Sequence, residues 1–240
     1  MRFRIALCIG LAAAAALPIA PTRASGENAP NQFAKYIYPL AKPLPAPNVT
    51  IDVTDVPEAL PWAEQARALV REWFPLVCQL LATERYKPPK TLKLTFRKEI
   101  PAPAYSTGDE ITINGKWIHD HPDDFGMVIH EMTHVIQAYP PGRANKPGWL
   151  VEGIADYIRW WRYEPESPRT PIDPQRASYR DSYRTTAAFL AWVVGKYNRA
   201  LVPELDRALR SRSYTDDLFK QLTGKSLDDL WSEFVGTIRR

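Results

Sequence analysis

Apolar positions alternate with polar ones early in the chain and recur at helical spacing later. Every second residue is apolar in three short segments, which predicts strands at 49–53, 92–96 and 111–113. Apolar residues three and four apart then predict helices over 62–83, from about 123 to 136, and over 150–161, 182–197, 201–211, 215–222 and 226–238. Pro75 is expected to interrupt the first helix. Strands followed by helices predict an α+β fold.

The second predicted helix carries two histidines four residues apart. Its start is expected at 122–124, because a proline followed by two aspartates is typical of a first helical turn. His130 and His134 lie about 40° apart around the axis and about 6 Å apart along it, so their rings can share one metal ion. Glu131 lies one step round the helix, within reach of a water bound to that metal. H-E-x-x-H is the zinc-hydrolase pattern, with the glutamate as general base.

The third predicted helix offers two carboxylates for the same site. Catalytic zinc usually has three protein ligands and one open position. Glu152 and Asp156 are four residues apart and therefore point the same way. We predict one Zn²⁺ held by His130, His134 and Glu152, with Asp156 accepting a histidine N–H and so setting the tautomer. The reverse assignment of the two acids stays open, as does an exposed acidic stripe on an amphipathic helix.

The residues around these motifs resemble a known family. Residues 130–137 and 152–159 resemble the basic secretory protein family, also called the peptidases of plants and bacteria, and the similarity covers roughly residues 48–238. The resemblance implies a secreted zinc metallopeptidase with a zincin-type fold and a glutamate as third metal ligand. Three positions depart from the family pattern and affect the expected substrate preference: Ser182 for a usual glycine, Arg184 for a usual aspartate and Ala188 for a usual arginine.

The resemblance also completes the expected architecture and catalytic set. One zincin-like domain over 48–240 is expected, with a small N-terminal sheet packed on the H-E-x-x-H helix and a helical C-terminal half. Tyr183 matches a family position at the start of a helix and is predicted to stabilise the oxyanion. Tyr179 and Tyr105 are alternatives, and a packing role for Tyr183 is open. Residues 109–114 are interpreted as an edge strand that can pair with an extended peptide.

The first residues of the chain have the pattern of an export signal. Basic residues at 2 and 4, an apolar stretch over 5–17 and small residues before position 25 predict a signal peptide over 1–24. Five prolines between 30 and 47 predict an extended arm over 25–47. No other apolar stretch is long enough to span a bilayer. We therefore expect an exported protein, periplasmic or extracellular, and a monomer.

Charge and cysteine content narrow the expected partners. Three arginines lie in 1–24, which leaves 28 basic against 27 acidic residues and a net charge of +1 instead of +4. The basic isoelectric point overstates the charge of the chain without residues 1–24, so we expect no nucleic-acid or membrane partner. Without Cys8, Cys78 has no partner for a disulfide and is expected to be a small buried residue. His119 and His121 are expected on the surface and not at the metal.

Three classes of function fit these observations. The first is a secreted zinc peptidase that hydrolyses peptides or proteins through a zinc-bound water activated by Glu131. The alternative is a secreted zinc-containing binding or defence module with little or no turnover. The third is an iron oxygenase, since two histidines and one carboxylate also suit Fe(II). An intact Glu131 favours the peptidase, because that glutamate has no obvious role in the other two classes.

Overall fold

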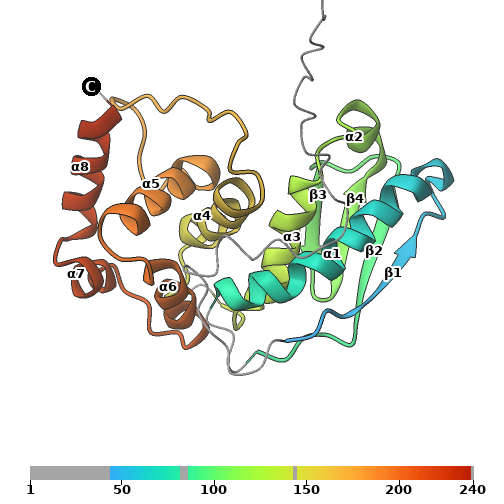
Figure 1. The fold of residues 1–240 in the computed structure, drawn as a ribbon, viewed down its shortest axis with the longest axis horizontal. Coiled ribbons are helices and arrows are strands. Elements are labelled where there is room, and N and C mark those ends of the chain that lie inside the picture. Colours follow the sequence, from blue (N-terminus) through green and yellow to red (C-terminus); the bar gives the residue numbers. More distant parts are fainter. Residues whose placement is uncertain (1–43, 82–85, 143–144, 239–240) are drawn as a thin grey trace, which may run out of the picture. The chain divides into compact units, whose positions relative to one another are not determined.

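A four-stranded sheet occupies the N-terminal half of the described chain (Figure 1). The structure is a computed structural model that describes residues 44–81, 86–142 and 145–238, all within one compact unit. The strands are β1 (Asn48–Asp52), β2 (Thr91–Arg97), β3 (Ala104–Thr107) and β4 (Glu110–Asn114). Their order in the sheet is β1-β2-β4-β3, and only the β3–β4 pair is antiparallel. The three predicted strands are confirmed as β1, β2 and β4.

The edge of the sheet differs from the prediction. The interpretation of 109–114 as an edge strand is wrong, because β4 lies between β2 and β3. Thr107 pairs with Glu110 across a tight turn, which Gly108 enters with a φ of 57°. This positive φ suits glycine, and the turn folds β3 back along β4. The free edge on this side of the described sheet therefore belongs to β3.

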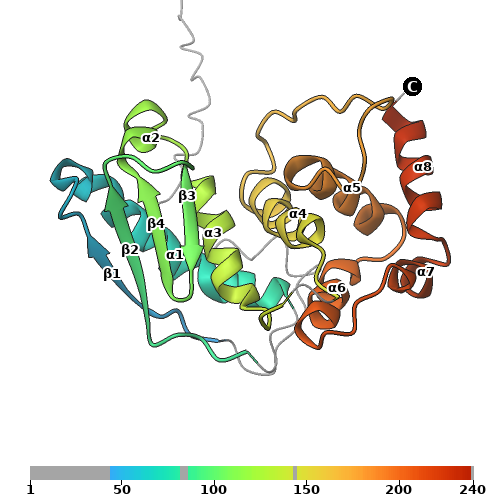
Figure 2. The ribbon, with the colours of Figure 1, turned by 180° about the vertical axis from the view of Figure 1, so that it is seen from behind.

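Helices α1 (Leu60–Leu80) and α3 (Gly126–Gln137) pack side by side on one face of the sheet (Figures 1 and 2). Helix α1 continues through Pro75, so the predicted interruption is wrong. Phe74 and Val77 on either side of the proline are fully buried. Burial of these side chains outweighs the one hydrogen bond that proline cannot donate.

Helix α3 begins three residues later than predicted, at Gly126. Asp124 does not enter the helix, because its carboxylate accepts hydrogen bonds from Trp117 Nε1 (2.9 Å) and Arg159 Nη2 (2.6 Å). Phe125 stacks on Trp62, with ring centroids 4.5 Å apart. The short helix α2 (Gly115–Asp120), which the sequence pattern did not predict, precedes this segment. Tertiary contacts therefore determine where α3 starts.

Helices make up the C-terminal half of the described chain. They are α4 (Gly148–Ile158), a π turn at Arg159–Tyr163, α5 (Tyr183–Lys196), α6 (Leu201–Arg210), α7 (Asp217–Thr223) and α8 (Leu227–Ile238). Helices α4 and α5 approach closely at Gly153, where an added Cβ would lie 2.2 Å from Thr186 Cγ2. No helix among the described residues is long and apolar enough to cross a membrane.

The described chain is thus mixed α and β, with α1 between β1 and β2 and all four strands before α3. The predicted signal peptide over 1–24 lies outside the described residues, as does all but the end of the predicted arm over 25–47. These two predictions therefore stay predictions.

Candidate metal centre

Helix α3 presents its two histidines away from the sheet. Its fully buried residues, among them Val128, Ile129 and Met132, fix the opposite side of the helix in the core. His130 and His134 are one turn apart, and their Nε2 atoms lie 3.1 Å from each other. His130 is buried, at 7% exposure, although it carries two polar ring nitrogens. Such a ring needs partners for both nitrogens.

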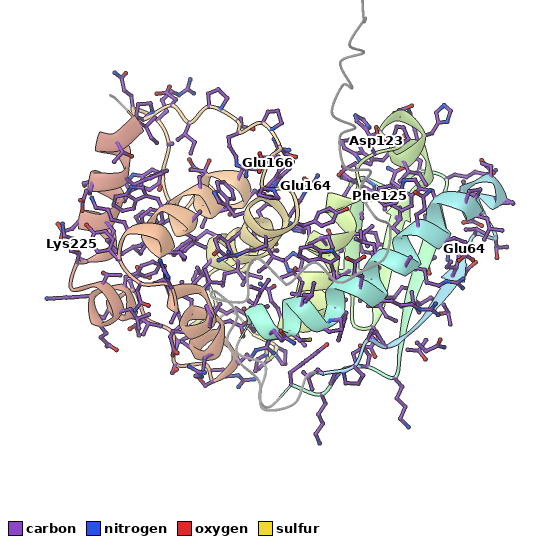
Figure 3. The ribbon with its side chains drawn as sticks, viewed as in Figure 1. Glu64, Asp123, Phe125, Glu164, Glu166 and Lys225 are labelled. Atoms are coloured by element: carbon purple, nitrogen blue, oxygen red, sulfur yellow. The ribbon has the colours of Figure 1, made fainter. Side chains whose placement is uncertain are left out.

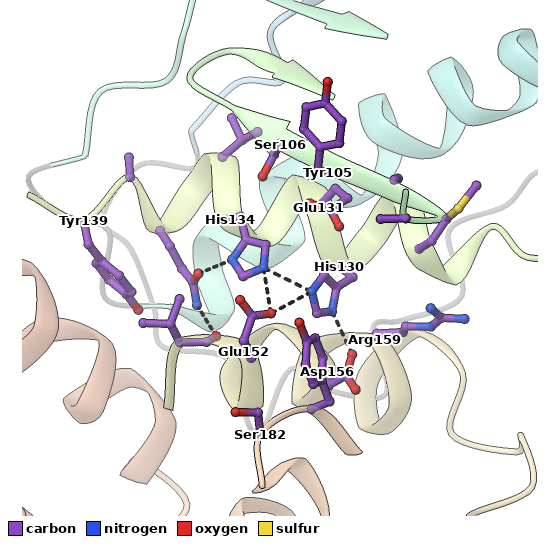
Figure 4. Close-up of a pocket in the computed structure, with 18 of the residues that line it drawn as sticks. Tyr105, Ser106, His130, Glu131, His134, Tyr139, Glu152, Asp156, Arg159 and Ser182 are labelled. Atoms are coloured by element: carbon purple, nitrogen blue, oxygen red, sulfur yellow. Dashed lines mark hydrogen bonds and ion pairs between the residues drawn. The ribbon is translucent and has the colours of Figure 1, made fainter. Parts of the chain in front are cut away.

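Helix α4 brings a carboxylate to the same point. Glu152 Oε2 lies 3.3 Å from Nε2 of each histidine (Figure 4). The ligand atoms of these three residues all lie within 4.8 Å of one another. Asp156, one turn further along α4, contacts the other nitrogen of His130, with 2.7 Å between its Oδ1 and Nδ1. The carboxylate beside both Nε2 atoms is therefore that of Glu152.

Both histidines have an acceptor at Nδ1. Asp156 accepts from His130, and Gln137 Oε1 lies 2.7 Å from Nδ1 of His134. Gln137 Nε2 donates to the carbonyl of Val151 at 3.1 Å, which fixes the amide orientation and leaves Oε1 as the acceptor. Each ring therefore carries a proton on Nδ1, and the Nε2 atoms of both rings face Glu152. The sequence reasoning missed Gln137, although its position three residues after His134 was a usable signal.

The electrostatics of the cluster favour a positive charge between the rings. Burial acts to lower the pKa of His130, but hydrogen bonds to Asp156 and Glu152 outweigh it and raise this pKa to about 9. Burial acts to raise the pKa of Glu152, but hydrogen bonds from the two histidines lower it to about 2. The carboxylate is therefore ionised at neutral pH.

The donor atoms have the spacing that a small divalent metal ion requires. Two ligands about 2.05 Å from a tetrahedral ion lie about 3.3 Å from each other. The three separations here are 3.1, 3.3 and 3.3 Å. Two imidazoles that bind through Nε2 once this nitrogen has lost its proton, together with one ionised carboxylate, form a donor set that suits zinc, and also Fe(II). His130, His134 and Glu152 can therefore hold one metal ion.

Comparison with known families agrees with this site. A family model described as "Peptidase of plants and bacteria" matches residues 61–234. The chain belongs to this family. The match runs from within α1 into α8 and includes His130, His134 and Glu152. Comparisons with curated proteins and with solved structures give no match.

In this family member His130, His134 and Glu152 line an open cavity of about 1180 Å³. Glu131 lines the cavity, as do Tyr105 and Ser106 of the edge strand β3 (Figure 4). Tyr183 faces the cluster from the start of α5, with its ring 6.1 Å from that of His130. The negative charge of Glu152 is the main cause that raises the pKa of the Tyr183 hydroxyl, which therefore keeps its proton at neutral pH.

The backbone leading to Tyr183 is strained. Ser182 has a φ of 65° and a ψ of −175°, a region that glycine adopts readily and other residues rarely do. Tyr183 itself has a φ of 46°. This geometry gives a physical reason why glycine suits position 182. It also holds the Tyr183 side chain half-exposed in the cavity.

The other candidates from the sequence fall into two groups. Tyr105 is exposed and lines the cavity, where a bound substrate can reach it. Tyr179 is wrong as an alternative to Tyr183, because it is buried outside the cavity lining and its hydroxyl donates to Asp228 at 3.0 Å. His119 and His121 are exposed and outside the metal cluster, as predicted. Cys78 is buried, and burial raises the pKa of its thiol to about 12.

Proposed function

We propose that the protein is a secreted zinc peptidase of zincin type that hydrolyses peptides or proteins. The observation that carries the proposal is the trio of ligand atoms 3.1–3.3 Å apart, beside Glu131 in an open cavity. Membership of a peptidase family supports it. Export rests on the signal pattern over 1–24. The zincin assignment rests on an H-E-x-x-H helix packed against a sheet whose antiparallel edge strand borders the site.

Each residue of the cavity has a role in this proposal. Zinc held by His130, His134 and Glu152 would polarise the scissile carbonyl and lower the pKa of water at the site to about 7. Glu131 takes the proton of the attacking water and delivers it to the leaving amine. The protonated hydroxyl of Tyr183 donates to the oxyanion as charge develops. A substrate in extended conformation pairs along the free edge of β3.

The glutamate base gives the first test. Glu131→Gln keeps the size of the side chain but removes its basicity, so turnover should fall by about 10²- to 10⁴-fold while zinc stays bound. The measurements are metal content by elemental analysis and cleavage of a mixed peptide pool by mass spectrometry, with and without a chelator. Glu64→Gln, on the outer surface of α1, is the matched control (Figure 3). Full activity in Glu131→Gln would remove this residue from the mechanism.

The same preparation separates the three classes of function. Zinc-dependent cleavage supports the peptidase. A zinc-loaded protein that cleaves no peptide would instead be a binding module, and purification with iron would favour an oxygenase. Among the ligand variants, Glu152→Gln should abolish the binding of one zinc ion per chain. Asp156→Asn should weaken zinc affinity only about 10- to 100-fold. The opposite ranking would make Asp156 the ligand.

A further inference from the structure

One wall of the cavity is built from two arginines and a tryptophan. Arg159 and Trp160 belong to the π turn after α4, and Arg184 belongs to the first turn of α5. The guanidinium carbons of Arg159 and Arg184 lie 4.3 and 4.0 Å from the centroid of a Trp160 ring. All three residues line the cavity that contains the metal cluster. Figure 4 shows Arg159 at the His130 end of the site and Tyr139 at the His134 end.

The charge of Arg159 is compensated within the protein. Its Nη2 lies 2.6 Å from Asp124 Oδ1, and its Nε lies 3.6 Å from Glu164 Oε2. Arg169, in the following loop, is also engaged, since it donates to four main-chain carbonyls. Figure 3 shows Glu164 beside the π turn. Asp124 and Glu164 therefore compensate Arg159, and main-chain carbonyls occupy the donors of Arg169.

Arg184 is not part of these ion pairs, although its charge acts on Glu164 at longer range. Its side chain donates to the neutral hydroxyl of Thr170 at 2.8 Å and is exposed. Among residues 44–81, 86–142 and 145–238, no carboxylate lies within 4.0 Å of its guanidinium nitrogens. Asp181 also lines the cavity, but its carboxylate accepts the main-chain N–H of Ser178 at 2.7 Å. A guanidinium has five N–H donors in a fork that matches a carboxylate, so most donors of Arg184 remain for a ligand.

We infer that Arg184 binds a carboxylate of the substrate close to the scissile bond. The inference rests on the proposed peptidase function. Arg184 follows Tyr183 directly in sequence, and the Tyr183 ring lies 6.1 Å from that of His130. Tyr183 and Arg184 both line the cavity that contains His130, so the carboxylate is sought within about two residues of the cleaved bond, where an extended peptide advances about 3.3 Å per residue. It is either an Asp or Glu side chain or the C-terminal carboxylate of a short peptide.

Matched peptides distinguish these two sources of the carboxylate. One series carries Glu or Gln at each of the two positions on either side of the cleaved bond, with amidated C-termini. A second series carries Gln throughout and ends in either a free acid or an amide two residues beyond that bond. A charge-assisted hydrogen bond contributes about 1.5–3 kcal/mol, so wild type should prefer one acidic member by about 10- to 100-fold in kcat/KM. The preferred series identifies the source.

Three variants assign that preference to Arg184. Arg184→Gln should reduce the ratio of kcat/KM between the acidic peptide and its amide counterpart to about 1. Arg184→Glu should reverse the preference, so that a peptide with lysine at the recognised position has a higher kcat/KM than its glutamate counterpart. Arg180→Gln is the matched control, because Arg180 is exposed, pairs with Asp216 at 3.4 Å and lies outside the cavity lining; it should keep the wild-type ratio.

Binding to the Glu131→Gln protein gives a measurement independent of turnover. Fluorescence anisotropy should show tighter binding of the acidic peptide, and Arg184→Gln in the same background should remove the difference. Zinc-dependent cleavage of neutral and acidic peptides at equal rates would overturn the role of Arg184 and leave the peptidase function intact. Absence of any cleavage would count against the peptidase function itself. In that case, equal binding of the acidic and neutral peptides would also overturn the carboxylate site.

Discussion

Replacing Arg210 by methionine removes the guanidinium that closes the carboxyl end of α3. Arg210 Nη2 donates to the carbonyl of Ile136 at 2.8 Å, and Nη1 donates to that of Gln137 at 3.0 Å. These carbonyls belong to the last turn of the helix and have no partner within it. Arg210 Nε also lies 2.6 Å from Asp206, which is fully buried and accepts the Tyr139 hydroxyl at 2.7 Å. The helix that carries both histidines is therefore anchored to α6.

The expected cost follows from what the substitution leaves behind. Asp206 would keep a buried negative charge and lose the guanidinium nitrogen 2.6 Å away, and two helix carbonyls would lose charged donors. Breaking a buried ion pair by removing one partner costs about 3–5 kcal/mol. In a domain of this size, 1 kcal/mol shifts the Tm by about 2–4 °C, so a fall of about 10 °C is expected. Zinc affinity should fall as well, because Gln137 orients His134.

Urea and thermal unfolding followed by circular dichroism measure this cost. Lys116→Met is a suitable control, because its pair with Asp120 is exposed and should contribute little to the free energy of unfolding. Adding Asp206→Asn to Arg210→Met should recover part of the loss, since the buried charge is then removed. A free energy of unfolding within about 1 kcal/mol of wild type in Arg210→Met would refute the reasoning.

Two further predictions concern the site. Tyr183→Phe should lower kcat about 10²-fold with KM, zinc content and Tm nearly unchanged, because the hydroxyl acts only as charge develops; a normal kcat would leave Tyr183 a packing role. Zinc affinity should rise between pH 6.5 and 9, measured by competition with a chromophoric chelator. Burial acts to lower the pKa of His130, but its hydrogen bonds to Asp156 and Glu152 outweigh burial and raise this pKa to about 9, so metal binding below that pH must displace a proton. By the same sign, the stabilisation that this raised pKa gives the zinc-free protein is complete below about pH 6.5 and is lost as pH rises through 9, which chelated samples would show as a falling Tm. A zinc affinity independent of pH over this range would contradict the protonation of His130.

The parts of the site that depend on helical periodicity could be predicted from the sequence. His130 and His134 share a face because they are four residues apart, and the same holds for Glu152 and Asp156. These are local relations, so they needed no knowledge of the tertiary structure. The proximity of Glu152 to both Nε2 atoms depends on how α4 packs on α3. Geometry alone left that assignment open, and the family resemblance favoured it.

Features that depend on distant partners could not be predicted. Helix α3 starts at Gly126 because Asp124 bonds Arg159, 35 residues further along the chain. Tyr179 is withdrawn from the cavity by Asp228, 49 residues away. The position of β4 inside the sheet depends on its pairing with both β2 and β3. Alternation of apolar residues carries no information about the order of strands. The proximity of Arg159 and Arg184 in the cavity wall could not be predicted either, because the two residues come from different elements.

The division of the metal ligands between α3 and α4 has a consequence for how the protein assembles. During synthesis the chain would complete the sheet and α3, with both histidines, before Glu152 on α4 emerges. The described residues contain a single cysteine, so no disulfide can link the sheet-bearing half to the helical half. An ion bound by all three ligands would act as the cross-link between the halves. This cross-link could form only after both halves had folded. Metal loading would then be a late step of maturation and would restrict opening of the seam between α3 and α4.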